Sequence, residues 1–203
     1  MTGWLKETLK FKDWILGSLK PTKEDFEWDS TGLPIIFQGQ ENTCVSCSVT
    51  FIQQWFEKNA LSHEWLAKIS GTKPEGVEPS KVLEAARKIG ICLEETYEKR
   101  PEMGYLDAQN HRIPAYAYIP NRSKENIAGH IEKNPIMVGV DDFNGKGPHM
   151  LAATGFNLRE NVVKCANWWR LDRQDFVTIP FNQITFACAI LPNKPLAKPT
   201  MQI

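Results

Sequence analysis

Apolar residues recur at every third or fourth position in the segment that follows residue 43. Such spacing places side chains on one face of an α-helix. It is shared by Val45, Val49, Ile52 and Phe56. Thr43 precedes the segment, and threonine is among the residues that cap helix N-termini. The pattern therefore predicts a helix that starts after Thr43 and is capped by it.

Three shorter helices are expected further along the chain. One covers residues 62–69, with a serine as its possible cap, and another runs from Pro79 through Lys88 and is closed by Gly90. Proline and glycine favour these first and last positions. A short helix is also expected over 123–133. Most of the predicted helix therefore lies before residue 90.

The second half of the chain has short β-branched and aromatic runs separated by turn residues, a pattern typical of antiparallel strands. The runs cover residues 115–119, 136–140, 150–156, 161–166, 176–179 and 186–191. We expect an α+β fold in which a helical lobe, about 25–112, packs against a β-rich lobe, about 113–203, with a cleft between them. Residues 1–24 are interpreted as a lead-in to this single domain, 25–203.

The composition is that of a folded protein with balanced charge. Lys plus Arg and Asp plus Glu number 24 each, and the chain contains five cysteines. Without a basic patch, nucleic acid is an unsuitable partner. No apolar run reaches the roughly 20 residues of a membrane span and no signal peptide is recognisable, so we expect no membrane association and a cytoplasmic location. The odd number of cysteines favours reduced thiols over a disulfide framework.

Cys44 is the best candidate for a reactive thiol. At the N-terminus of the predicted helix, unpaired backbone N–H groups would stabilise negative charge and lower the pKa of the thiol. Gln38 lies six residues upstream, and Gly39 lets the chain turn there. The Gln38 amide and the Cys44 backbone N–H could donate to an oxyanion beside the sulfur. These features predict nucleophilic catalysis by Cys44.

His149 differs in context from the other three histidines. It follows a flexible Asn-Gly-Lys-Gly-Pro turn and opens an apolar strand, so its ring can be held at a strand edge that faces the cleft. Asn167 follows the apolar run 162–165 and precedes Trp168 and Trp169, and a hairpin would return its carboxamide to the imidazole. His149 is therefore the predicted general base, oriented by Asn167.

Three motifs, in this order, resemble those of papain-family cysteine peptidases. Residues 38–44, Gln-Gly-Gln-Glu-Asn-Thr-Cys, resemble the nucleophile motif of the bacterial branch that lacks the half-cystine before the nucleophile. Residues 149–156 resemble the family's histidine strand, and 167–169, Asn-Trp-Trp, are similar to its Asn-Ser-Trp motif. Weaker similarity to the family's sequences extends over roughly residues 25–191.

The resemblance implies a papain-like two-lobe fold and a cysteine endopeptidase or exopeptidase. Such an enzyme acts on protein or peptide substrates through a thioester and needs no cofactor or metal. Catalytic roles fall on Cys44, His149, Asn167 and Gln38. Trp169 would shield the His-Asn hydrogen bond, and the backbone at Gly76 and Val77 would pair with substrate on the non-primed side, which becomes the acyl group. The family usually has two glycines where this chain has Gly76-Val77, and a serine where it has Trp168.

Three other functions stay open on the sequence. A transpeptidase or isopeptidase would share the whole triad, and an inactive papain-like module would bind a peptide without cleaving it. The third is a redox protein, because Cys44 and Cys47 have the C-x-x-C spacing. A structural zinc site is disfavoured because it needs about four ligands and no second C-x-x-C pair is present. If Cys47 has neither a redox nor a metal-binding role, it is expected to be a buried residue of the core.

Overall fold

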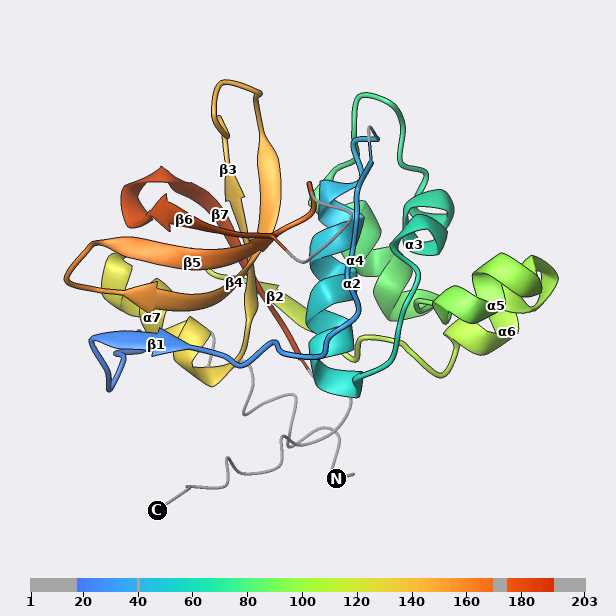
Figure 1. Cartoon of the computed structure of the whole chain (residues 1–203), viewed down its shortest axis with the longest axis horizontal. Helices are drawn as coiled ribbons and strands as arrows, with labels where there is room; N and C mark the ends of the chain where they lie inside the picture. The colour runs from blue at the N-terminus through green and yellow to red at the C-terminus, as the bar shows by residue number, and fades with distance from the viewer. Residues whose placement is uncertain (1–17, 40, 170–174, 192–203) are drawn as a thin grey trace, which may run out of the picture.

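The computed structural model describes residues 18–39, 41–169 and 175–191. Within these ranges a 7-stranded sheet lies beside a group of helices (Figure 1). The strands are β1 Asp25–Glu27, β2 Tyr116–Tyr118, β3 Ile136–Val140, β4 His149–Asn157, β5 Val162–Asn167, β6 Asp175–Pro180 and β7 Ile184–Ile190. The helices are α2 Cys44–Glu57, α3 His63–Ser70, α4 Pro79–Lys88, α5 Glu94–Lys99, α6 Gly104–Ala108 and α7 Lys124–Lys133, with short 3-10 turns at Pro101–Met103 and Phe181–Gln183.

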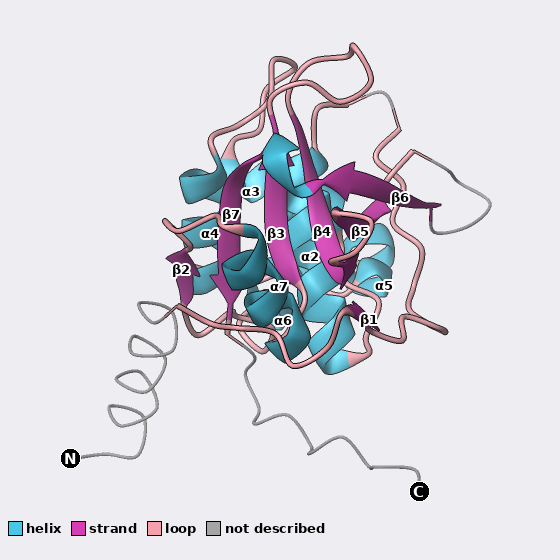
Figure 2. Ribbon diagram, turned by 90° about the vertical axis from the view of Figure 1, so that its left-hand side faces the viewer, coloured by secondary structure: helices cyan, strands magenta, loops and turns pink. Residues whose placement is uncertain are grey.

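Strand β4 lies at the centre of the sheet (Figure 2). The order is β2-β7-β3-β4-β5-β6, every pairing is antiparallel, and β1 pairs with β4 outside this path. The β4–β5 register shifts between Ala153 and Gly155. A glycine is required at 155, because a Cβ there would lie 2.5 Å from the carbonyl oxygen of Phe26 in β1. The first residue of β4 and the last residue of β5 are His149 and Asn167, so this strand pair carries both to one end of the sheet.

Helix α2 is buried on all sides. Every residue from Val45 to Trp55 is buried, and α2 packs against α3, α4 and β4. One polar side chain of the helix also ties it to the loops around it. The side chain of Gln54 donates to the carbonyl oxygen of Pro34 at 3.2 Å and accepts from the N–H of Leu61 at 2.9 Å. A helix fixed this firmly holds its first residue, Cys44, in a defined place.

Most of the predicted elements are confirmed. Helix α3 begins after Ser62, whose hydroxyl accepts from the N–H of Trp65 at 3.3 Å. Pro79 is the first residue of α4, and Ser123 caps α7 through the N–H of Asn126. The predicted strands of the second half all occur, with bounds that differ by a few residues. Antiparallel pairing and the α+β class are as expected.

The predicted cap of α2 is wrong. Thr43 precedes the helix, but its side chain makes no capping hydrogen bond. The backbone of Thr43 has φ −99° and ψ 15° instead of the extended conformation of most N-caps. Its hydroxyl consequently lies 3.7 Å from Cys47 Sγ, inside the first turn.

Elements β1, α5 and α6 were not predicted. All are shorter than seven residues, too short to display a helical or alternating period. Strand β1 consists of three residues whose extended form depends on pairing with β4. Local sequence does not contain that information, because the partner lies about 130 residues away.

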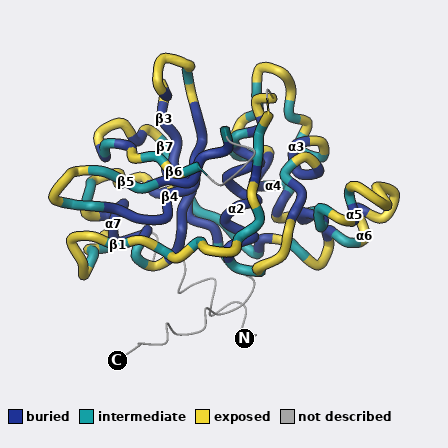
Figure 3. The backbone as a smooth tube through the Cα atoms, viewed as in Figure 1, coloured by how far each residue is buried: buried dark blue, intermediate teal, exposed yellow. Residues whose placement is uncertain are grey.

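Buried apolar side chains form one large cluster between α7 and the sheet and another between the sheet and helices α2 to α4 (Figure 3). Trp168 belongs to the second cluster and is fully buried. Its ring lies 5.4 Å from that of Phe51 in α2, and its Nε1 donates to the carbonyl oxygen of Met150 at 2.9 Å. Trp168 therefore fills the junction between the two lobes.

The segment that follows β1 crosses from the sheet to the helices. Trp28 Nε1 donates to the carbonyl oxygen of Ile131 in α7 at 2.6 Å, and the Trp28 ring lies 4.9 Å from that of Trp55 in α2. The chain then runs along α2 toward Cys44 (Figure 1). Leu19 already contacts α7, its N–H donating to Asn126 Oδ1 at 2.8 Å. The domain boundary at residue 25 stays a prediction.

Candidate active site

Cys44 is the first residue of α2 and is half-buried. Its thiol interacts with the backbone N–H groups of Met150, Val45 and Cys44 itself. Met150 directly follows His149 in β4, so the sulfur lies against the strand that carries the histidine. Cys44 and His149 both line a cavity of about 380 Å³. The structure thus brings together the thiol and the imidazole that the sequence pointed to.

The expectation that the helix N-terminus lowers the pKa of Cys44 is not met. Burial raises this pKa above the usual value of a thiol, and the backbone N–H groups that favour the thiolate only partly oppose it. Burial also lowers the pKa of His149, against the opposing effect of the Asn167 hydrogen bond. Both shifts favour a neutral thiol beside a neutral imidazole.

His149 and Asn167 are joined by a buried hydrogen bond. His149 Nε2 lies 2.9 Å from Asn167 Oδ1, and the two residues are 7% and 1% exposed. On its other side Asn167 Nδ2 donates to Asp175 Oδ2 in β6 at 3.4 Å, and the two residues are paired in the β5–β6 register. An ionised carboxylate accepts only, so it turns the amide N–H of Asn167 toward itself and the amide oxygen toward His149.

This arrangement fixes the histidine tautomer. An oxygen at Asn167 accepts, so Nε2 of His149 carries the proton and Nδ1 keeps its lone pair. Nδ1 is then the nitrogen that can take a proton from a thiol. An imidazole held in this tautomer and orientation can serve as a general base.

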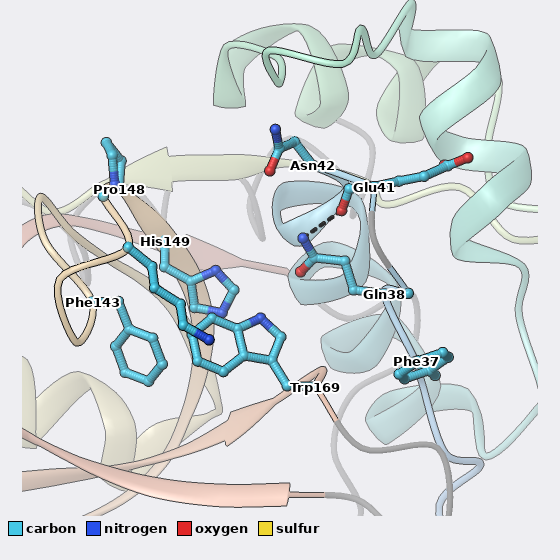
Figure 4. Close-up of a pocket in the computed structure, with 11 residues that line it drawn as sticks. Phe37, Gln38, Glu41, Asn42, Phe143, Pro148, His149 and Trp169 are labelled. Carbon is cyan, nitrogen blue, oxygen red and sulfur yellow. Dashed lines mark hydrogen bonds between the residues drawn. The ribbon is translucent and has the colours of Figure 1, made fainter.

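Two aromatic rings flank the imidazole of His149 (Figure 4). Phe143 stacks on it with ring centres 5.0 Å apart and 27° between the planes, and Trp169 contacts it at 5.0 Å with a tilt of 40°. Trp169 thus lies beside the imidazole, and its shielding of the His-Asn hydrogen bond stays a prediction. Phe143 was missed by the sequence reasoning, although it lies only six residues before His149. A lone aromatic residue in a polar turn gives no sign that the turn folds it back onto the ring.

Gln38 lies across the cavity from His149 (Figure 4). Its backbone N–H donates to the carbonyl oxygen of Trp168 at 2.9 Å, which ties the Gln38 loop to the residue after Asn167. Its side-chain Nε2 donates to the carbonyl oxygen of Glu41 at 2.5 Å. One of the two amide hydrogens is thereby used and the other is left for a further acceptor.

Gly76 and Val77 line the 380 Å³ cavity together with Cys44 and His149. Gly76 has φ +101°, a conformation that favours glycine. Its carbonyl oxygen accepts from the N–H of Lys73 at 3.4 Å, which closes a tight turn beside the cavity. Val45, Met150 and Phe186 contribute apolar side chains to its lining, and Glu75, Asp141 and Lys146 contribute charged ones.

The second cysteine of the C-x-x-C pair is not placed for redox chemistry. Cys47 is fully buried, and burial raises its pKa well above that of a free thiol. Cys92, Cys165 and Cys188 are also buried. Among the described residues no group of three or more His, Cys, Asp or Glu side chains could hold a metal ion, and no helix is long and apolar enough to cross a membrane.

No family model and no curated protein matches the sequence. Solved structures do match. Xylellain, a cysteine protease from Xylella fastidiosa, has a TM-score of 0.71 at 15% identity over 88% of each chain. This chain has the papain-like fold.

Two plant enzymes support the same papain-like fold. The Carica candamarcensis cysteine protease CMS1MS2, in complex with E-64, has a TM-score of 0.67 at 15% identity, over 85% of this chain and 100% of that one. The bromelain protease from Ananas comosus, also with E64, has a TM-score of 0.63 at 15% identity, over 83% and 99%. At 15% identity the likeness shows the fold alone.

Proposed function

We propose that this protein is a cysteine peptidase that hydrolyses peptide bonds through Cys44, His149 and Asn167. The observation that carries the proposal is the 2.9 Å contact of His149 Nε2 with Asn167 Oδ1, beside a cavity that His149 and Cys44 both line. A nucleophile, a base and a group that orients the base are the three parts that covalent acyl transfer needs. The papain-like fold, shared with known cysteine proteases, supports the same conclusion.

In the first step Cys44 Sγ forms a bond to the carbonyl carbon of the substrate while its proton passes to His149 Nδ1. Because both groups are neutral at rest, the charges develop during this step, where neighbouring dipoles stabilise them most effectively. The buried Asn167 oxygen faces Nε2–H and stabilises the imidazolium that forms. Phe143 and Trp169 keep the ring in place and limit the access of water to this hydrogen bond.

The substrate oxygen becomes negative in the same step. The Cys44 backbone N–H and the second amide hydrogen of Gln38 are the proposed donors to it. A donor of this kind typically contributes about 2.7–4 kcal/mol to the lowering of the barrier. His149 then gives its proton to the leaving amine, and a water molecule, deprotonated by His149, hydrolyses the thioester to release the acid and the free thiol.

Substrate is proposed to lie extended along Gly76 and Val77 on its acyl side. A peptide bound in this way adds main-chain hydrogen bonds as an extra strand would. The apolar lining near Met150 and Phe186 would then receive a side chain of the acyl part. These contacts are what a peptidase needs to hold the scissile bond beside Cys44.

The test uses single variants on a library of quenched fluorescent peptides. We expect Cys44→Ala and His149→Ala to abolish turnover, and Cys47→Ala to retain it at some level, because Cys47 lies in the core. Mass spectrometry of the folded wild-type protein, treated at neutral pH with an irreversible thiol-directed epoxide, should show a single adduct on Cys44. Loss of turnover in Cys47→Ala but not in Cys44→Ala would overturn the assignment.

The adduct measurement and two further assays separate the rival functions. A folded protein that binds peptides, forms no adduct and releases no product would be a binding module. Product analysis with an added amine acceptor distinguishes a transpeptidase, which joins the acyl group to the amine, from a hydrolase. Reduction of insulin disulfides that survives His149→Ala would favour a redox protein.

A further inference from the structure

The cavity in front of His149 contains a lysine whose position is set by Trp169. Lys146 Nζ lies 4.5 Å from the centre of the Trp169 ring, and that ring lies 5.0 Å from the imidazole of His149. The cation is attracted to the face of the indole, an interaction that is strongest for tryptophan. Nζ is therefore less than about 10 Å from the imidazole centre.

The turn that carries Lys146 is held by its own hydrogen bonds. The backbone N–H of Lys146 donates to the carbonyl oxygen of Phe143 at 3.2 Å. The backbone N–H of Phe143 donates to the carbonyl oxygen of Gly147 at 2.9 Å. Phe143 in turn stacks on His149. The start of the lysine side chain is thus fixed relative to the imidazole.

No carboxylate of the described residues lies within 4.0 Å of Lys146 Nζ. The two acids of the same turn have other partners. Asp142 Oδ1 accepts from the N–H of Gly147 at 3.1 Å, and Asp141 Oδ1 accepts from the Thr185 hydroxyl at 2.7 Å. The positive charge of Lys146 therefore faces the cavity without an ion-pair partner in the described part of the chain.

With substrate lying along Gly76 and Val77 as proposed, this cavity of about 860 Å³ is on the leaving-group side of the scissile bond, because Gln38 and Trp169 line it and Gly76 and Val77 do not. Lys146 and His149 line both cavities, so they lie where the two cavities meet. Of the described residues that line it, Lys146 and Glu41 carry formal charges. Glu41 directs its carboxylate away from His149 (Figure 4). The leaving-group side near His149 is consequently electropositive.

We propose that Lys146 binds a substrate carboxylate one or two residues beyond the scissile bond. An extended residue spans about 3.3–3.6 Å, so a carboxylate at either position is within reach of Nζ from a bond held beside His149. The carboxylate belongs either to the end of the substrate chain or to an aspartate or glutamate side chain. The first source would make the enzyme a carboxypeptidase that removes one or two residues. This inference rests on the proposed peptidase function.

The test compares peptides of one sequence that differ only on the leaving-group side. One ends in a free carboxylate two residues after the scissile bond, one ends there in an amide, and one carries glutamate at that position followed by an amide. We expect wild-type kcat/KM to be about fivefold higher for the peptides with a carboxylate than for the neutral amide, the size of an exposed ion pair. Preference for the free terminus or for glutamate identifies the source.

The readout is the ratio of kcat/KM between the charged and neutral peptides. Lys146→Gln should reduce this ratio to about one and Lys146→Glu should bring it below one, whereas Lys146→Arg should keep it. Lys133→Gln is the matched control, because it removes the same charge from the end of α7. An unchanged ratio in Lys146→Gln, or a wild-type ratio of one, would overturn the proposal.

Binding separates this inference from the peptidase proposal. Calorimetry with the Cys44→Ala protein and the same acid and amide peptides measures the carboxylate site without turnover. Tighter binding of the acid that disappears in Cys44→Ala/Lys146→Gln supports the site even if no peptide is cleaved. Equal binding of acid and amide contradicts it even if the protein is an active peptidase.

Discussion

The side-chain amide of Asn167 has two different ends, and only one of them serves His149. If the amide were turned over, an N–H group would face Nε2 and the imidazole would adopt the opposite tautomer. Asp175 opposes this by accepting from Nδ2 at 3.4 Å. Asp175, separated from the thiol by His149 and Asn167, therefore favours the tautomer in which Nδ1 of His149 is the proposed base.

Asp175→Leu tests this positioning role. Without the carboxylate the Asn167 amide loses one acceptor that holds it in this orientation. We expect kcat to fall about tenfold, less than the loss caused by removing a group that contacts the imidazole directly, while KM changes little. Steady-state kinetics on a neutral peptide measures both constants. Asp175→Asn, which can still accept from Nδ2, should restore part of kcat. Equal losses in Asp175→Leu and Asp175→Asn, or a rise in KM alone, would contradict the assignment.

At this scale the sequence identified the residues but not all of their interactions. Cys44 and His149 could be selected because a helix start and a strand start are visible in the local pattern. Asp175 and Phe143 could not, because their roles depend on strand register and on a turn that folds back. The raised pKa of Cys44 was missed for the same reason, since burial arises from packing of the two lobes.

Among the elements, α4 shows how one backbone position controls packing. Gly90 follows this helix with φ +107°, and a Cβ there would lie 1.8 Å from the carbonyl oxygen of Ala108 at the end of α6. Backbone cannot move aside as a flexible side chain can. The close approach of α4 and α6 thus requires glycine at position 90.

Gly90→Ala should destabilise the protein by about 3 kcal/mol or more, from the clash and the unfavourable φ together. Gly71→Ala is the matched control. Gly71 also has a positive φ, +70°, but a Cβ there meets nothing within 4 Å, so we expect a loss of about 1 kcal/mol. Urea unfolding of both variants measures the difference. Equal losses would mean that the contact with Ala108 relaxes without cost.

Helices α2, α3, α4 and α7 and the longer strands could be predicted because each contains enough residues to show its period. The short elements β1, α5 and α6 could not, since tertiary contacts create them. The role of Trp168 could be predicted only in part. Its departure from the family motif was visible in the sequence, but its partners Phe51 and Met150 come from different elements. Its place in the lobe junction therefore required the structure.

Four histidines contribute to the pH dependence of stability of the whole molecule, and their pKa values are shifted in opposite directions. Burial lowers the pKa of His63 and of His130 to about 4 and also lowers that of His149, whereas the hydrogen bond to Glu57 raises the pKa of His111. A histidine whose pKa is lower in the folded than in the unfolded protein stabilises the folded state above pH 6.5. This stability is lost as the pH falls toward 4. A raised pKa contributes stability below pH 6.5 that is lost as the pH rises.

We expect the free energy of unfolding to decrease between pH 7 and pH 4. His130 is fully buried, and a pKa shift from 6.5 to about 4 corresponds to about 3 kcal/mol of this decrease. His130→Leu should lose less stability over this interval than the wild type, and His111→Gln should lose more. Denaturant unfolding at a series of pH values measures both. The same pH dependence in all three proteins would refute this account.

The chain between β1 and α2 fastens the two lobes to each other at both of its ends. Trp28 joins α7 to α2 through its hydrogen bond to Ile131 and its contact with Trp55, and Gln38 is tied to Trp168 at the other end of the same segment. Hinge rotation that widened the cleft would break contacts at both ends. The gap between the lobes is then held by these contacts, and a substrate has to fit the gap without widening it. A peptidase of this design would cleave flexible tails and unfolded chains and spare compact folded proteins of the same sequence.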